Sequence, residues 1–293
     1  MHIKYTQLEA NLLKVTNLVK RYPAFLLDNV SFEVPSGYIT GFIGANGAGK
    51  STTLKSVMNI VFPDSGEVEI FGENMKTHET EIKQKIGFLM GAVNSYQLVK
   101  VEKYVDVTSS FYKEWRQDVC DGYLKKFGID KNKKIKELSQ GMKVKLGLAI
   151  ALSHEADLFI LDEPTSGLDP VARDEILEIL SDIVSSGDKS VLFSTHITSD
   201  LEKCADYILF IKDGKIVEND TKDGLLDSYA IIRGGVDELT EDIIKKSVGV
   251  KKNKYNFSAL ISREKLAGVE GFSVDRPTLE DISVYYGRGN GNV

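Results

Sequence analysis

The sequence predicts an α/β protein organised around a phosphate-binding loop, and three observations lead to this prediction. Residues 44–52 read Gly-Ala-Asn-Gly-Ala-Gly-Lys-Ser-Thr, which matches the pattern G-x-x-x-x-G-K-[ST] without a mismatch. A β-prone run over residues 38–43 precedes this loop, and a run that can be helical, residues 53–60, follows it. Further along, residues 158–161 form a continuous apolar run, which is typical of a parallel strand buried on both faces, and two acids follow this run directly.

Length, charge and cysteine content limit the class of protein. The 293 residues suggest one large or two small domains, and 42% hydrophobic with 27% charged residues suggests a soluble globular chain. The net charge of −6 argues against a nucleic-acid-binding surface. No apolar run approaches the roughly 18 residues of a membrane span, and residues 1–9 lack the apolar core of a signal peptide. Cys120 and Cys204 form no metal or disulfide pattern, so we expect reduced thiols in a cytoplasmic protein.

The loop at residues 44–52 has the chemistry that bound phosphate requires. Its glycines allow successive backbone N–H groups to turn inward around an anion, and the following helix adds the partial positive charge of its N-terminus. Lys50 can reach the β- and γ-phosphates, and the Ser51 hydroxyl can bind Mg²⁺. We therefore expect a nucleotide triphosphate site here.

Two alternating runs precede the loop. Residues 12–22 and 27–34 alternate apolar with polar side chains and predict two antiparallel strands, closed by a turn at residues 35–37. Tyr22 follows the first strand, where its ring can stack on a nucleotide base or pack against the sheet. The sequence leaves both interpretations open.

The segment after the loop predicts strands and then helices. Residues 66–72 and the apolar run 86–90 are each predicted to form a strand. Residues 101–127 carry aromatic and aliphatic side chains at helical spacing and predict two or three helices. Trp115 lies among them, and we interpret it as a core residue rather than an interface residue.

Two helix starts carry capping residues. Ser139 is a predicted N-cap of a helix that runs to residue 152, and Gly141 leaves the backbone open in its first turn. This start is either a simple cap or a second anion-binding helix N-terminus, and the local residues favour the cap. Asp169, followed by Pro170, is predicted to cap a helix over residues 171–185.

The acid pair and one histidine follow buried strands. Asp162 suits the shell of a Mg²⁺ ion, and Glu163 suits a general base that orients or deprotonates water. His196 ends the predicted strand over residues 191–195, from which it can contact a γ-phosphate. Because ligands bind beyond the carboxyl ends of strands in open α/β sheets, these side chains are expected near the phosphate loop.

A hairpin and a C-terminal segment complete the chain. Residues 207–218 predict a hairpin with an Asp213-Gly214 turn. Beyond it, residues 237–246 predict a helix and residues 258–261 a strand, whereas residues 287–293 are expected to be disordered.

Taken together, these motifs resemble the nucleotide-binding subunit of an ATP-binding-cassette (ABC) transporter, over about residues 12–235. Tyr22 is similar to the adenine-stacking aromatic, residues 138–142 to the family signature, Asp162 and Glu163 to the Walker B acid and the catalytic base, and His196 to the switch histidine. Lys50 and the other loop residues resemble the Walker A motif. The positions that the resemblance assigns to the nucleotide are Tyr22, Gly44, Asn46, Gly47, Ala48, Gly49, Lys50, Ser51, Thr52, Ser139, Gly141 and Asp169.

The resemblance implies a fold, cofactors and partners. It implies a P-loop NTPase core of ABC type, with an antiparallel β subdomain, a helical subdomain at about residues 92–156 and a small C-terminal α+β extension. The cassette would span residues 1–223 and the extension residues 224–293. It implies ATP and Mg²⁺ as cofactors and a second cassette packed head to tail, whose phosphate loop Ser139 and Gly141 would face. It also implies an integral membrane permease partner on the inner face of the cell membrane, and no nucleic acid.

Two departures from the family pattern bear on activity. The signature has Gln140 and Met142 where the family usually has glycine and glutamine, although Ser139 and Gly141 are kept. Gly91 stands where the family places a glutamine or an acid, so no side chain there can reach the metal or the attacking water. We therefore expect altered coupling to the partner or altered hydrolysis.

The tail favours one subgroup. Residues 276–282 resemble the ending of exporter-type cassettes. Among these cassettes, the helical segment around Trp115 and residues 195–206 resemble small bacterial exporters of antimicrobial or amphipathic peptides and acetoin-utilisation-type cassettes. The alternative is a non-transport ABC ATPase that acts on nucleic acid or in cofactor assembly. A P-loop kinase leaves residues 139–142 and His196 without a role.

Overall fold

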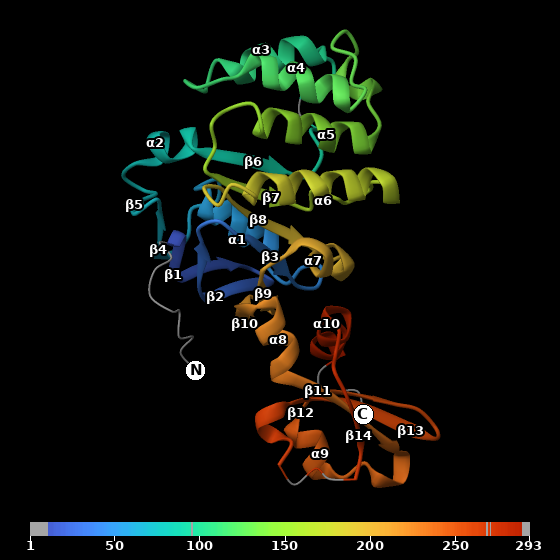
Figure 1. The fold of residues 1–293 in the computed structure, drawn as a ribbon. Helices are drawn as coiled ribbons and strands as arrows, with labels where there is room; N and C mark the ends of the chain where they lie inside the picture. The colour runs from blue at the N-terminus through green and yellow to red at the C-terminus, as the bar shows by residue number, and fades with distance from the viewer. Residues whose placement is uncertain (1–10, 95, 268, 270, 289–293) are drawn as a thin grey trace.

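The computed structural model describes residues 11–94, 96–267, 269 and 271–288, and it divides into three regions along one axis (Figure 1). A helical region lies at one end, a layered α/β region in the middle and a small sheet with helices at the other end. Residues 1–9 and 289–293, about which the sequence analysis makes predictions, lie outside the described residues. Among the described helices, none combines the length and the apolar character that a membrane crossing requires.

The middle region is built on a six-stranded sheet of order β10-β9-β3-β8-β7-β6. Its strands are β3 (Ile39–Ile43), β6 (Ile86–Met90), β7 (Leu158–Asp162), β8 (Ser190–Thr195), β9 (Tyr207–Lys212) and β10 (Lys215–Thr221). All neighbours are parallel except the β9–β10 hairpin. Every residue of β3, β7 and β8 is buried, which explains why these strands are apolar runs. Met90, Asp162 and Ser194 are in register, so three strands end at one edge.

Two hydrophobic clusters cover the two faces of this sheet. On one face Phe42 and Ile160 pack with helix α1 (Lys50–Val57) and a second, antiparallel sheet of order β2-β1-β4-β5. On the other face Ile43 and Leu161 pack with three helices, α5 (Gln140–Ala151), α6 (Pro170–Val184) and α7 (Thr198–Cys204). The side chains of one strand alternate between the two clusters, as the two-residue period of a strand requires.

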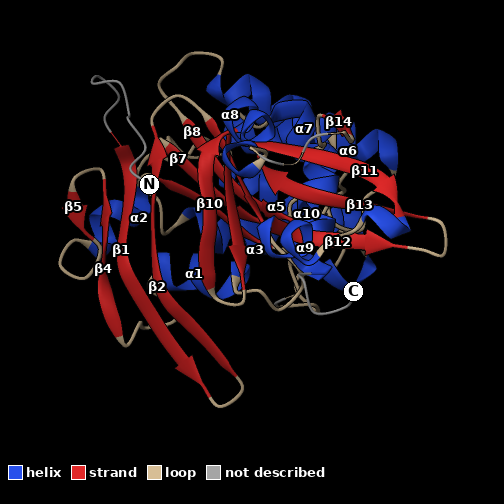
Figure 2. Ribbon diagram, turned by 90° about the horizontal axis from the view of Figure 1, so that it is seen from below, coloured by secondary structure: helices blue, strands red, loops and turns tan. Residues whose placement is uncertain are grey.

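The antiparallel sheet confirms the predicted strand pair. It contains β1 (Asn11–Tyr22), β2 (Phe25–Pro35), β4 (Ser65–Ile70) and the short β5 (Glu73–Asn74), followed by helix α2 (Glu79–Gln84). Tyr22 pairs with Phe25 where the chain turns between β1 and β2. Figure 2 shows this sheet on the side of the molecule opposite to the C-terminal sheet.

The helix after the phosphate loop is displaced from its predicted range of residues 53–60. It begins at Lys50, because the N–H of Thr53 already donates to Gly49 O at 2.9 Å. It ends at Val57, and Asn59 follows with a left-handed φ of 54°. The loop motif therefore supplies the first turn of the helix itself.

The helical region contains α3 (Val101–Ser109), α4 (Gln117–Lys126), a 3₁₀ turn (Ile135–Glu137) and the start of α5. The prediction of two or three helices is confirmed. Trp115 is partly buried and forms an isolated β-bridge with His154, three residues after the end of α5. Tyr112 stacks on His154, with ring centroids 3.9 Å apart, and on Trp115. This aromatic cluster joins the helical region to the central sheet.

The C-terminal region is a four-stranded antiparallel sheet of order β12-β13-β11-β14. It follows α8 (Lys222–Ser228), in which the expected boundary after residue 223 falls. It contains β11 (Tyr229–Gly235), α9 (Glu241–Lys246), β12 (Ser247–Lys252), β13 (Asn256–Ser262), β14 (Ser273–Asp275) and α10 (Leu279–Arg288), with 3₁₀ turns at Val236–Glu238 and Arg263–Lys265.

Two expectations for this region need correction. The helix predicted over residues 237–246 starts only at Glu241, because the Thr240 side chain accepts from the N–H of Ile243 and caps the helix there. Gly287 was expected in a disordered end but lies in α10. This helix is held to α7 by a hydrogen bond from the N–H of Leu279 to Glu202 Oε1 at 3.0 Å.

Candidate functional site

A cleft of about 730 Å³ lies at the carboxyl edge of the central sheet. It is lined by the end of β1, the phosphate loop and the segments that follow β7 and β8. The lining residues are Tyr22, Ala24, Phe25, Asn46, Gly47, Gly49, Lys50, Ser51, Thr52, Glu163, Ser166 and His196. Most of the residues predicted for one nucleotide therefore meet in one cleft. Gly44, Ala48 and Asp162 are buried and are not among the lining residues, and Ser139, Gly141 and Asp169 lie outside the cleft as well.

The phosphate loop adopts a conformation that its glycines permit. Gly47 and Gly49 have φ of 82° and 116°, which are left-handed values that favour glycine. A Cβ atom at Gly44 would lie 2.5 Å from the carbonyl oxygen of Ile211, so no larger residue fits there. These positions fix the loop against β9 and leave its other side open to the cleft.

Lys50 lies between the loop and the acid that follows β7. Its Nζ donates to Gly44 O at 2.7 Å and lies 3.8 Å from Glu163 Oε1. Burial lowers the pKa of the Lys50 ammonium, whereas the carboxylates of Glu163 and Asp162 raise it. The ammonium is thus placed where a phosphate in the loop would meet it.

The acid pair separates into a buried and a cleft-facing carboxylate. Asp162, the last residue of β7, is buried and accepts a hydrogen bond from Ser194 Oγ at 2.5 Å. Glu163 has a left-handed φ of 53°, and its N–H donates to the carbonyl oxygen of Ser194 at 3.0 Å. Its Oε2 is hydrogen-bonded to His196 Nδ1 at 2.8 Å. The turn therefore directs Glu163 and His196 together into the cleft.

An aromatic pair forms the far wall of the cleft. Tyr22 is 43% exposed there, which fits a stacking surface better than packing against the sheet. Phe25, which the sequence analysis does not single out, lies beside it. Its ring packs against the phosphate loop, since a Cβ added at Gly49 would lie 2.9 Å from Phe25 Cζ. An aromatic residue directly across the turn from Tyr22 is the signal that would have identified it.

Ser139, Gly141 and Asp169 lie outside the cleft of the same chain. The Ser139 hydroxyl caps α5 by accepting from the N–H of Met142 at 3.2 Å. Asp169 caps α6 by accepting from Val171 and Ala172, and these hydrogen bonds lower the pKa of its carboxyl. A Cβ at Gly141 would lie 3.0 Å from Leu168 Cδ2, so the start of α5 packs on the loop that precedes α6.

Gly91 leaves an open space next to the end of β7. It has a φ of 57°, and its N–H donates to the carbonyl oxygen of Asp162 at 3.0 Å. Apart from its two chain neighbours, no atom of the described residues would lie within 4 Å of a Cβ added at this position. The backbone of residue 91 thus lies beside the acid pair without contributing a side chain.

A buried polar network that the sequence analysis missed supports the turn after Glu163. Asp200 on α7 is only 1% exposed, and its Oδ2 accepts from Thr165 Oγ1 at 2.7 Å. Arg173 on α6 places its Nε 3.9 Å from Asp200 Oδ1. These residues lie up to 35 positions apart and carry no local pattern. The network joins the segments after β7 and β8, which carry Glu163 and His196.

We expect Thr165→Val to lower kcat several-fold and leave the affinity for ADP unchanged. It removes the hydrogen bond to a buried carboxylate, which costs about 1–3 kcal/mol, and loosens the turn without touching the phosphate loop. Thr40→Val is the matched control, since Thr40 is equally buried and its Oγ1 has no partner among the described residues. Steady-state ATPase kinetics and calorimetry test this. Equal kcat in both variants would contradict it.

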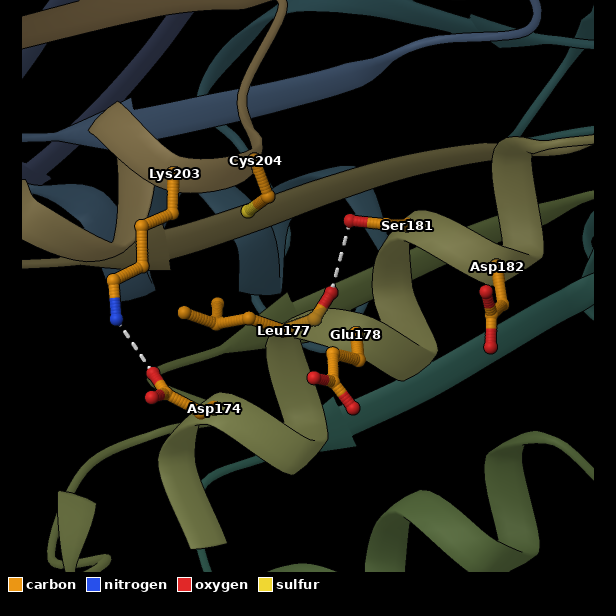
Figure 3. A pocket seen from close by; sticks show the side chains of 7 residues that line it. All are labelled: Asp174, Leu177, Glu178, Ser181, Asp182, Lys203 and Cys204. Carbon is orange, nitrogen blue, oxygen red and sulfur yellow. Dashed lines mark hydrogen bonds and ion pairs between the residues drawn. The ribbon is translucent and has the colours of Figure 1, made fainter. Parts of the chain in front are cut away.

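A second hollow, of about 310 Å³, lies between α6 and α7, away from the phosphate loop (Figure 3). Lys203 Nζ pairs with Asp174 Oδ1 at 2.6 Å across it, and Leu177 lies at its base. Burial raises the pKa of the Cys204 thiol to about 12, so this thiol stays protonated and is a poor nucleophile. The hollow therefore provides no reactive thiol, and it shares no lining residue with the nucleotide cleft.

Comparison with known proteins agrees with this geometry. The family described as "ABC transporter" matches residues 27–166. The bacitracin transport ATP-binding protein of Bacillus licheniformis is 32% identical over 71% of this chain and 69% of its own length. The lantibiotic transport ATP-binding protein SrtF of Streptococcus pyogenes is 36% identical over 73% of this chain and 92% of its own length.

Two further matches differ in how much of the chain they cover. A solved structure of an ATP-binding subunit of an ABC transporter has a TM-score of 0.67 and 27% identity, and it covers 73% of this chain and 91% of that one. An uncharacterized ABC transporter ATP-binding protein of Methanocaldococcus jannaschii is 34% identical over 92% of this chain and 97% of its own length. The chain therefore belongs to the ABC transporter family, as one of its ATP-binding and ATP-hydrolysing subunits.

Proposed function

We propose that this subunit powers a separate membrane permease that exports a peptide or another amphipathic or toxic compound. The observation that carries the proposal is the single cleft in which Lys50, Glu163 and His196 converge on the phosphate loop. The class of substrate rests on the relatives whose names specify bacitracin and lantibiotic transport. The cassette is assigned to residues 1–223 and the extension to residues 224–293.

Within one chain, each side of the cleft has a distinct role in the proposed reaction. Tyr22, supported by Phe25, stacks on adenine, and the backbone N–H groups of residues 44–52 hold the phosphates. Lys50 neutralises charge on the transferred phosphoryl group. Glu163 orients the attacking water and takes its proton, and His196, 2.8 Å from Glu163, fixes the direction of that carboxylate.

Mg²⁺ is the metal that fits this site. The Ser51 hydroxyl lies in the cleft and the Asp162 carboxylate lies just beneath it, so both provide the oxygen ligands that Mg²⁺ prefers. The described residues hold no cluster of three or more carboxylate, histidine or cysteine ligands, so water and the nucleotide's phosphates would complete the shell. When bound, the ion offsets negative charge on the phosphates.

Ser139, Gly141 and Asp169 are proposed to act on the ATP of a second cassette. They lie together on an exposed edge, at the start of α5 and in the loop that packs on it, and outside their own cleft. A helix N-terminus is an anion-binding site, and a second cassette packed head to tail would bring this one to the γ-phosphate. Hydrolysis would then require a dimer, either of two copies or with a different cassette.

The helical region offers the surface for the permease. Tyr96, Leu98 and Phe111 are each 70% exposed, and they lie in the segment after Gly91 and just beyond α3. Exposed apolar side chains of this size are typical of protein interaction sites. Docking there would hold the subunit peripherally on the inner face of the cell membrane, in the cytoplasm.

Purification of the tagged full-length chain from detergent-solubilised native membranes tests this proposal. We expect a multi-span membrane protein to co-purify in a fixed ratio, and Leu98→Glu to reduce its recovery. Phe62→Glu is the matched control, because Phe62 is also 70% exposed but lies outside the helical region. Recovery only from the soluble fraction, with nucleic acid or assembly factors, would instead support a non-transport ABC ATPase.

A further inference from the structure

A cavity of about 250 Å³ lies between the phosphate loop and β9, next to the nucleotide cleft with which it shares Asn46 and Gly47, and the last helix of the extension forms one of its walls. Three groups of residues line it, from the loop, from the end of β9 and from α10. Ala48 of the loop, Phe210 and Ile211 of β9 and Tyr286 of α10 are among them. The extension therefore reaches the side of the phosphate loop that packs on β9, which we call the outer face of the loop.

Tyr286 anchors α10 to the central sheet. Its ring packs on Phe210 of β9, with centroids 4.9 Å apart. Its hydroxyl donates to Glu218 Oε1 on β10, and Tyr229 of β11 donates to the same oxygen. The two tyrosine hydroxyls lie 2.8 Å apart, so the extension holds Glu218 from two of its elements.

The β9–β10 hairpin is in turn attached to the phosphate loop. The N–H of Gly214 in its turn donates to the carbonyl oxygen of Ala48 at 3.0 Å. Ile211 lies so close to Gly44 and Gly49 that a Cβ at either position would meet its atoms at 2.5 to 3.1 Å. Because closely packed atoms transmit displacement, a shift of Phe210 and Ile211 changes the position of the loop.

We propose that Tyr286 is a positioning residue for nucleotide binding: through Phe210 and the β9–β10 hairpin, helix α10 supports the outer face of the phosphate loop and couples docking of the extension to occupancy of the cleft. The inference rests on the assignment of residues 44–52 as the nucleotide-binding loop. Coupling between two sites is reciprocal, so bound nucleotide must stabilise the docked α10 to the same degree.

Two measurements on the full-length chain test this coupling. By calorimetry, Tyr286→Leu is expected to raise the Kd for Mg-ADP about 5-fold or more, which is the usual lower range of such coupling. ADP is the ligand of this test because the cleft that is proposed to hold it is lined by residues of one chain. In the unsubstituted chain, ADP is expected to slow amide hydrogen exchange across residues 279–287, a readout that a purely structural role would not change.

The control variants separate the possible outcomes. Arg276→Gln removes the ion pairs to Asp223 and Asp227, which hold the extension without touching the loop, and should leave the Kd unchanged. Tyr286→Phe keeps the ring and loses only the hydroxyl, so it replaces Tyr286→Leu if that variant does not fold. Unchanged exchange in α10 with ADP, or a wild-type Kd in both Tyr286 variants, would overturn the inference. Lys50→Ala must abolish binding in parallel; if it does not, the nucleotide assignment itself is wrong.

Discussion

Glu163→Gln is expected to bind ATP with near wild-type affinity and to lose hydrolysis by about 10²- to 10⁴-fold, the usual contribution of a general base. The amide keeps the size of the side chain but cannot take a proton from water. Glu163 is placed for this role by the left-handed turn after β7 and by its hydrogen bond to His196. Because ATP would persist in the cleft, the variant should also accumulate as an ATP-bound dimer.

Phosphate release and size-exclusion chromatography with and without Mg-ATP measure both effects. Glu178→Gln, a substitution of the same kind on the exposed face of α6, is the matched control and should behave as wild type. Near wild-type turnover in Glu163→Gln would contradict the assignment of Glu163 as the catalytic base. Loss of ATP binding would instead indicate that the carboxylate serves to hold the nucleotide.

Ser139→Arg is expected to lower the rate of ATP hydrolysis by about 10²-fold or more, while the Kd for ADP stays unchanged. The substitution puts a bulky cation at the exposed start of α5, where the proposed dimer requires close approach of the partner's γ-phosphate. In its own chain this position lies outside the cleft, so the affinity of a single cassette for nucleotide should not change.

The cap that Ser139 provides must be separated from this effect. Ser139→Ala removes the hydrogen bond to Met142, which costs about 1 kcal/mol of helix stability, without adding bulk. Ser185→Arg introduces the same cation at an exposed serine after α6. If Ser139→Arg turned over ATP like Ser185→Arg, the signature would have no role in trans.

The parts of the site that the sequence predicts are those whose chemistry is local. The phosphate loop needs glycines at fixed positions, and the acid pair ends an apolar run, so both leave a continuous pattern. The buried strands β3, β7 and β8 are found for the same reason. His196 is predicted from its place at the end of a buried strand, and the resemblance adds the role of switch histidine.

The parts that the sequence misses are made by the fold. Asp200 becomes a hydrogen-bond partner of Thr165 only when β7 and β8 lie side by side. The local sequence around either residue does not predict this hydrogen bond. Phe25 acquires a role only because a hairpin turns it toward Tyr22. In the extension, β14 has three exposed residues and so lacks the alternation that marks a strand. Contact between Tyr286 and β9 depends on tertiary packing alone.

Trp115, packed with Tyr112 and His154 where the helical region meets the central sheet, has a spectroscopic consequence. It is the chain's only tryptophan, so intrinsic emission excited at long ultraviolet wavelengths comes from this one junction. Rotation of the helical region against the sheet would change the stacking of the indole and therefore its emission. The unlabelled protein thus carries its own optical reporter, with which such a movement can be timed during a catalytic cycle.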